Sequence, residues 1–204
     1  MNRVMYYGAK LWDLIYLNIL TMLCCIPLIT TGASWTAMQY TLLKIYRDED
    51  DGVTKCFFRA FRSNFLQSTG LMLFFGEVLY LLWLNYTLTR DLDSELPDFL
   101  LVLLPVLIIL VLCVGVWAFV LQARYRNSVF TTIKNAAFIA LRHPIRSLLM
   151  AVLAFLPIIL IKLTLRSVPV VILLGFTAGG LAQVQLYNSI LVKLENGSRQ
   201  DSVS

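Results

Sequence analysis

One carboxylate stands out among the residues that could do chemistry. Glu77 lies near the middle of an apolar run over residues 66–89. A charged side chain at the centre of a bilayer costs about 2.5–3.5 kcal/mol on insertion scales, unless it is protonated, paired or hydrated. Two roles fit such a residue: it couples a proton or cation to transport, or it forms an intramembrane hydrogen bond. The candidate partners for that bond are the side-chain amides of Gln183, Gln185, Asn188 and Asn18.

No residue pattern points to catalysis. The sequence has no phosphate-binding P-loop and none of the motifs GxGxxG, HExxH or GxSxG. The single histidine, His143, precedes a proline, which argues against a serine–histidine–aspartate triad. The four cysteines form no CxxC pair, and one histidine cannot complete a cysteine–histidine zinc site. We therefore predict a protein that is not an enzyme and that has no cofactor or metal.

The composition indicates that lipid surrounds most of the chain. Of the 204 residues, 59% are hydrophobic and 14% are charged, and the mean hydropathy is +0.76. A soluble domain has about 25% charged residues, and one of this length cannot hide so many apolar side chains in its core. A transmembrane helix needs about 20 apolar residues. Five runs have about this length: 11–29, 66–89, 99–121, 148–165 and 168–191.

These runs are continuous rather than alternating, which favours helices over a membrane β-barrel. We therefore predict an all-α fold: a polytopic transmembrane bundle of about five spans, forming one membrane domain over residues 1–204. The last part of this domain, residues 192–204, is a polar cytoplasmic tail. The net charge is +5, but the basic residues flank the apolar runs. The predicted partner is thus the lipid bilayer and not a nucleic acid.

The basic residues also predict an orientation. Five lysines and arginines lie in residues 30–65, five in 122–147 and two in the tail, against five elsewhere. By the positive-inside rule, both basic segments and the C-terminus face the cytoplasm. With five spans, the N-terminus is then outside.

Residues 33–46 leave this orientation open, because they form a short apolar helical pattern after a break at Pro27 and Gly32. This segment could continue the first span, re-enter the membrane or lie on its surface. If it crossed the membrane fully, the N-terminus would be inside.

The two basic segments resemble each other. Residues 41–48 can be aligned with 120–127, and residues 58–62 with 138–142, both at offsets near 80. This similarity predicts a parallel internal repeat of an apolar helix, a short basic helix and a second apolar helix.

Residues 53–65 have the pattern of an amphipathic helix in the headgroup layer. Aromatic side chains share one broad face and basic side chains lie mostly off it. The segment is either a cytoplasmic docking element for a partner or a membrane-anchored connector. The residues concerned are Lys55, Phe57, Phe58, Arg59, Phe61, Arg62 and Phe65.

Three glycines predict a close helix–helix contact. Gly175 and Gly179 form a GxxxG pattern, which Gly180 extends, and small residues at this spacing let a second helix approach closely. The sequence leaves open whether that helix belongs to this chain or to another protein.

Three stretches in the first third of the chain carry a family resemblance. They resemble the YesL-like family of bacterial integral membrane proteins, and they are residues 17–38 (LNILTMLCCIPLITTGASWTAM), 42–49 (LLKIYRDE) and 57–67 (FFRAFRSNFLQ). Ala33 departs from the proline that many members have after the glycine. The resemblance implies a multi-pass protein of the bacterial cytoplasmic membrane whose function is not defined, often encoded near carbohydrate ABC importers.

Three functional hypotheses follow. The first is a non-catalytic accessory subunit that packs against the permease of a carbohydrate ABC importer. The second is a small transporter or channel that uses Glu77 in its pathway. The third is an ABC-type permease, since residues 134–156 are basic and then apolar, although the usual Glu-Ala-Ala coupling pattern is missing.

Overall fold

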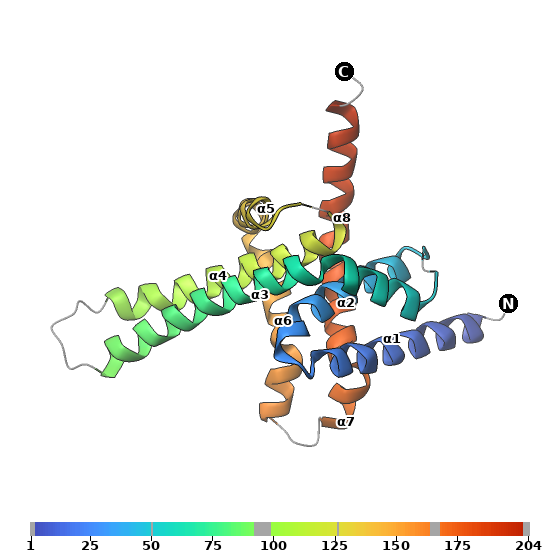
Figure 1. Cartoon of the computed structure of the whole chain (residues 1–204), viewed down its shortest axis with the longest axis horizontal. Helices are drawn as coiled ribbons and strands as arrows, with labels where there is room; N and C mark the ends of the chain where they lie inside the picture. The colour runs from blue at the N-terminus through green and yellow to red at the C-terminus, as the bar shows by residue number, and fades with distance from the viewer. Residues whose placement is uncertain (1–2, 50, 92–98, 126, 164–167, 202–204) are drawn as a thin grey trace.

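The computed structural model describes residues 3–49, 51–91, 99–125, 127–163 and 168–201, and this part of the chain is helical without strands (Figure 1). The predicted all-α bundle is therefore confirmed. The elements in order are α1 (Arg3–Cys25), the 3-10 turn η1 (Leu28–Thr30), α2 (Thr31–Tyr46), α3 (Val53–Asp91), α4 (Phe99–Arg124), α5 (Val129–Arg142), α6 (Pro144–Leu163), α7 (Val168–Val170), the π-helix η3 (Val171–Gly175) and α8 (Phe176–Asp201).

Four helices in the described ranges are long and apolar enough to cross a membrane, namely Gly8–Cys25, Val53–Arg90, Phe99–Arg124 and Pro144–Lys162. The fifth predicted run, 168–191, is also helical, but the π-helix η3 interrupts it. Its amides at Gln183, Gln185 and Asn188 make it less apolar than the other four. Length and composition thus support a multi-pass membrane protein.

Helix α2 is the centre of the bundle. Helix α1 ends just before Pro27, which has no N–H to continue the hydrogen-bond ladder. Through η1 the chain turns, and α2 packs against α1, α3, α4 and α8. Eleven of its sixteen residues are buried, among them Ala33, Met38 and Leu42. Residues 33–46 therefore form neither an extension of α1 nor a surface helix, but a buried helix that runs back along α1.

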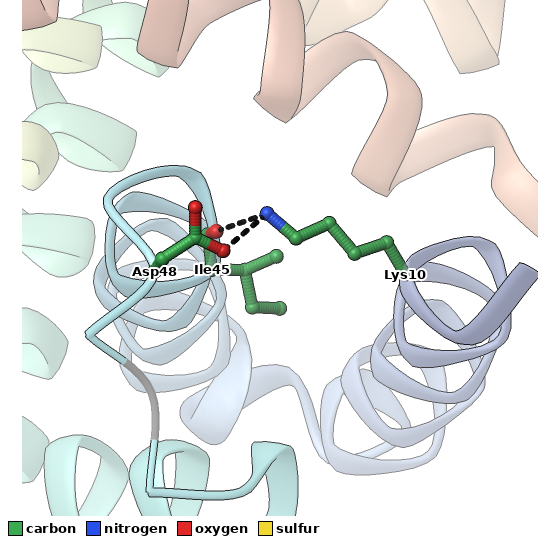
Figure 2. Close-up of polar contacts among 3 residues, drawn as sticks. All are labelled: Lys10, Ile45 and Asp48. Carbon is green, nitrogen blue, oxygen red and sulfur yellow. Dashed lines mark hydrogen bonds and ion pairs between the residues drawn. The ribbon is translucent and has the colours of Figure 1, made fainter. Parts of the chain in front are cut away.

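An ion pair joins the ends of this α1–α2 hairpin (Figure 2). The Nζ of Lys10 lies 2.6 Å from Oδ1 of Asp48 and donates a hydrogen bond of 3.2 Å to the carbonyl of Ile45. A cation is favoured there because the last carbonyls of a helix are unpaired and carry partial negative charge. Lys10 and the start of the 48–52 connection thus lie at the same end of the molecule. This contact disfavours the predicted orientation, which has Lys10 and the basic segment 30–65 on opposite sides of the membrane. The side of the membrane on which each end lies stays a prediction.

Helix α3 is one continuous helix of 39 residues. It joins two segments predicted as separate, the amphipathic helix 53–65 and the span 66–89. Residues 76–90 of α3 and 99–112 of α4 extend together away from the other helices, and none of their residues is buried within the chain (Figure 1). We call this pair of helix segments the distal hairpin.

Glycines allow the closest helix contacts. A Cβ on Gly179 would lie 2.8 Å from the carbonyl oxygen of Leu153 in α6, and one on Gly180 would lie 2.6 Å from Cδ1 of Leu42 in α2. For a Cβ on Gly175, the three nearest atoms would all belong to Val171, one turn earlier in the π-helix η3. Gly179 and Gly180 therefore pack against helices of this chain.

The two regions of the predicted repeat share a helix–turn–helix. Helix α2 is followed by a short connection and α3, and α4 is followed by a short connection and α5. The two regions differ at the end of the second helix. Helix α5 ends before His143 and α6 begins at Pro144, whereas α3 continues without interruption through Asn64, the residue 80 positions before Pro144. Proline accounts for the difference, since it cannot donate the hydrogen bond that an unbroken helix requires. The repeat itself stays a prediction.

Candidate functional site

A polar cavity lies where α2, α3 and α4 meet, with a volume of about 260 Å³. It brings together the two basic segments that the sequence predicts to lie on one side of the membrane, because Arg59 comes from the first and Arg124 from the second. We call it the basic cavity. Its lining consists of Tyr40, Arg59, Ala60, Ser63, Asn64, Gln122, Ala123, Arg124 and Tyr125.

A network of amides fixes one wall of the basic cavity. The side chain of Gln122 is 1% exposed, and its Nε2 donates to Oε1 of Gln67 and, at 3.4 Å, to Oδ1 of Asn64. Its Oε1 accepts a hydrogen bond of 3.2 Å from the hydroxyl of Thr132 in α5. Buried amides are stable only when paired in this way, so the network holds α3, α4 and α5 in register.

The lining of the basic cavity is cationic. It contains two guanidinium groups and no carboxylate. The carboxylate of Asp51 approaches Arg59 at 3.5 Å, but both side chains are about half exposed, and such exposed pairs contribute little. The hydroxyls of Tyr40, Ser63 and Tyr125 add further hydrogen-bonding groups. This arrangement suits the binding of an anion, and it offers no pair of acid and base groups for catalysis.

A second cavity, of about 370 Å³, is almost entirely apolar. It lies where the distal hairpin meets the rest of the bundle, between Trp35 and Phe119, with Phe155 and Phe176 also in its wall. Gly76 lines this cavity but Glu77 does not.

Glu77 has an exposed side chain on the distal hairpin. Within the described part of the chain it forms no hydrogen bond or ion pair. The expected intramembrane bond to Gln183, Gln185, Asn188 or Asn18 is not formed. Three of these amides bond elsewhere, and Gln185 is exposed on α8.

Gln183 belongs to a buried cluster between α2, α6 and α8. The side chain of Gln39 donates to Oε1 of Gln183, whose Nε2 donates at 2.7 Å to the carbonyl of Met150. The hydroxyl of Tyr187 donates at 3.4 Å to Oε1 of Gln39. All of these side chains are almost completely buried. The cluster therefore holds α8 against α2, and it is a packing contact rather than a ligand site.

Asn188 lies near the end of α2. Its Oδ1 accepts hydrogen bonds from Nε and Nη2 of Arg47 at 3.1 and 2.8 Å. Two N–H groups of one guanidinium thus converge on a single oxygen, which fixes the orientation of both side chains. This contact ties the basic end of α2 to α8.

The aromatic face predicted for residues 53–65 points partly into the protein. Phe57 is fully buried and stacks on Phe61 with ring centroids 6.0 Å apart, and Phe61 contacts Phe65 at 5.7 Å. Phe58 is exposed. Lys55, Arg59 and Arg62 are exposed as well. Much of this face thus packs within the chain, which supports a structural role for it.

Sequence reasoning did not find Tyr40, Asn64, Gln122 or Thr132. The available signal was weak, since isolated polar residues inside apolar helices are usually packing contacts. Only the meeting of α3 with α4 shows that Asn64 and Gln122 form one site.

Comparison with known proteins gives one match. No curated protein and no solved structure matches the chain. Residues 14–86 match a family described as a protein of unknown function, DUF624. The matched region runs from α1 through the α3 half of the basic cavity to Glu77 and the start of the distal hairpin. Over these residues the chain is therefore similar to a family whose function is not known.

Proposed function

We propose that the protein is a non-catalytic subunit of the bacterial cytoplasmic membrane that assembles with another integral membrane protein through its distal hairpin. The observation that carries this proposal is Glu77, an exposed carboxylate on an apolar hairpin that extends away from the other described helices and has no buried residue over 76–90 and 99–112 (Figure 1). A carboxylate facing lipid at this depth is unfavourable. A donor on a partner helix would relieve that cost, since polar side chains bond across helices in membranes.

The partner that we propose is the permease of a carbohydrate ABC importer. The support is the resemblance of residues 17–38, 42–49 and 57–67 to YesL-like proteins, together with the match over residues 14–86 to the unknown-function family. The accessory role is favoured over a transport pathway through Glu77, because this residue lines neither of the two cavities.

We also propose that both termini face the cytoplasm. Since Lys10 pairs with Asp48, the N-terminal basic residues join the side of the two basic segments. The remaining cations, Arg90, Lys162 and Arg166, fall near the other ends of α3 and α6 in the sequence. This distribution follows the positive-inside rule more closely than an outside N-terminus does.

Co-purification with variants tests the assembly. The tagged full chain is expressed at its native level, extracted in a gentle detergent and analysed by mass spectrometry for membrane proteins that co-purify. We expect a permease with wild type, and at least about a tenfold loss with Glu77→Leu. The matched control is Asn85→Leu on the same hairpin, because Asn85 donates to the carbonyl of Leu81 in its own helix, at 2.8 Å, and to no other group in the described ranges.

Two results would contradict the proposal. One is a Glu77→Leu protein that retains the same partners as wild type. The other is an isolated wild-type protein that moves a solute across liposome membranes, with that flux abolished by Glu77→Gln. The second result would establish the transporter alternative.

A further inference from the structure

The basic cavity combines features that together select a particular class of ligand. Arg59 of α3 and Arg124 of α4 line the same small volume, and the hydroxyls of Tyr40 and Ser63 line it from α2 and α3. Among the described residues no aspartate or glutamate lines it, and the exposed carboxylate of Asp51 approaches Arg59 at 3.5 Å from outside the lining. A cavity that concentrates positive charge in this way favours an anion and disfavours cations and metal ions.

We propose that the basic cavity binds a phosphate group. Guanidinium groups recognise phosphate through two parallel N–H···O bonds, and the hydroxyl of Tyr40 supplies a further donor to a remaining oxygen. The hydroxyl of Ser63 donates to the carbonyl of Ala60 at 3.2 Å and would have to rotate to contact the ligand. The neighbouring amide of Gln122 is already paired with Gln67, Asn64 and Thr132, so the wall of the cavity is rigid before a ligand arrives. A preformed site loses less freedom on binding.

The phosphate can come from two sources, which share this chemistry. Basic pockets between helices at the cytoplasmic side of membranes bind the headgroups of anionic phospholipids. The exposed ring of Phe58, next to Arg59 in the sequence, and the tyrosines in the lining suit the membrane interface. A soluble phosphate would reach the same groups from the aqueous side. None of the lining residues belongs to the distal hairpin. The test of phosphate binding is therefore independent of the test of the proposed assembly.

Two binding measurements on the full-length protein test the site. Native mass spectrometry compares retention of phosphatidylglycerol with retention of phosphatidylcholine carrying the same acyl chains. Calorimetry in detergent titrates inorganic phosphate. We expect wild type to prefer phosphatidylglycerol, to bind inorganic phosphate, or both. If the protein prefers phosphatidylglycerol but does not bind inorganic phosphate, the ligand is a lipid headgroup. If it binds inorganic phosphate without a lipid preference, the ligand is a soluble phosphate. If it binds both and each displaces the other, the two share one site.

Single variants locate the site. Arg59→Gln and Arg124→Gln should each weaken whichever binding wild type shows by about tenfold or more, because a charge-assisted hydrogen bond is lost. Arg59→Lys and Arg124→Lys should retain part of the binding, since lysine keeps the positive charge but cannot form two parallel N–H···O bonds to the phosphate. Arg62→Gln and Arg142→Gln are matched controls, because both arginines are exposed on α3 and α5 but neither lines the cavity.

A thermal unfolding curve for each variant separates lost binding from lost folding. The proposal is overturned if wild type shows neither preference for phosphatidylglycerol nor binding of inorganic phosphate. It is overturned equally if folded Arg59→Gln and Arg124→Gln proteins bind like wild type, or if Arg62→Gln weakens binding as much as they do.

Discussion

The side-chain amide of Asn18 in α1 donates a 2.7 Å hydrogen bond to the carbonyl of Ile172, inside the π-helix η3. The same side chain donates at 3.2 Å to the carbonyl of Val171 and accepts from the N–H groups of Phe176 and Thr177 at 3.0 and 3.1 Å. A π-turn widens the helix and disturbs its regular hydrogen-bond ladder. One asparagine thus satisfies carbonyls on one side of the turn and N–H groups on the other.

Replacing Asn18 should therefore destabilise the bundle. We expect Asn18→Leu to lower the free energy of unfolding by about 1–3 kcal/mol, because it leaves buried backbone groups unpaired. Unfolding in mixed micelles of a mild detergent and dodecyl sulfate measures the change. Asn85→Leu, at an exposed site on the distal hairpin, should change stability by less than about 0.5 kcal/mol. Equal stability of Asn18→Leu and wild type would show that the π-turn does not need this side chain.

The buried amides of Gln39 and Gln183 should behave as a coupled pair. Each single change to leucine removes the bond between the two amides and leaves one polar atom of the remaining amide unpaired, Oε1 of Gln183 or Nε2 of Gln39, whereas the double change removes both of these atoms. We expect the double variant to be less destabilised than the sum of the single variants, with a coupling near 0.6 kcal/mol. The same mixed-micelle unfolding gives all four stabilities. Strict additivity would contradict a direct bond between the two residues.

Glycine contacts should differ in their tolerance of alanine. A Cβ on Gly32 would lie 2.5 Å from the carbonyl oxygen of Ser68, and one on Gly179 would lie 2.8 Å from that of Leu153. These are backbone atoms, so α3 or α6 would have to move, and overpacking of this kind costs about 1–3 kcal/mol.

Gly76 provides the control, since a Cβ there meets nothing within 4 Å. Gly76→Ala should leave stability unchanged or raise it by up to about 1 kcal/mol, because alanine is the better helix former. Thermal unfolding in detergent ranks the three proteins. If all three variants unfold at the same temperature, the close approach of these helices is not required for stability.

The ion pair between Lys10 and Asp48 predicts the sidedness of α1. In a protein whose native cysteines are replaced, single cysteines at Gly8 and Asp51, both exposed, should react with a membrane-impermeant thiol reagent from the same side of the membrane. A cysteine at position 95 should react from the other side. The measurement uses intact cells and inside-out vesicles. Labelling of positions 8 and 51 from opposite sides would exclude the hairpin of α1 and α2.

The sequence was sufficient to predict helices in lipid. A run such as 99–121 contains no charge and has the length to cross a bilayer, and both properties are local. The break at Pro27 is also local, because proline lacks the donor that a continuing helix needs. For the same reason the break between α5 and α6 falls at Pro144. The connection after Tyr46 contains Gly52 at a φ of +97°, a conformation that glycine adopts without strain.

Tertiary structure decided everything that depends on which helices meet. The composition of residues 33–46 fits a surface helix or a buried one, and packing against four helices makes α2 buried. The return of α2 along α1 puts Lys10 beside Asp48, and this contact is the basis of the proposal that the N-terminus lies on the side of the basic segments. Arg59 and Arg124 share one cavity only because α3 and α4 are neighbours. Contacts between residues far apart in a chain leave no periodic pattern in its sequence, so no local rule could have predicted them.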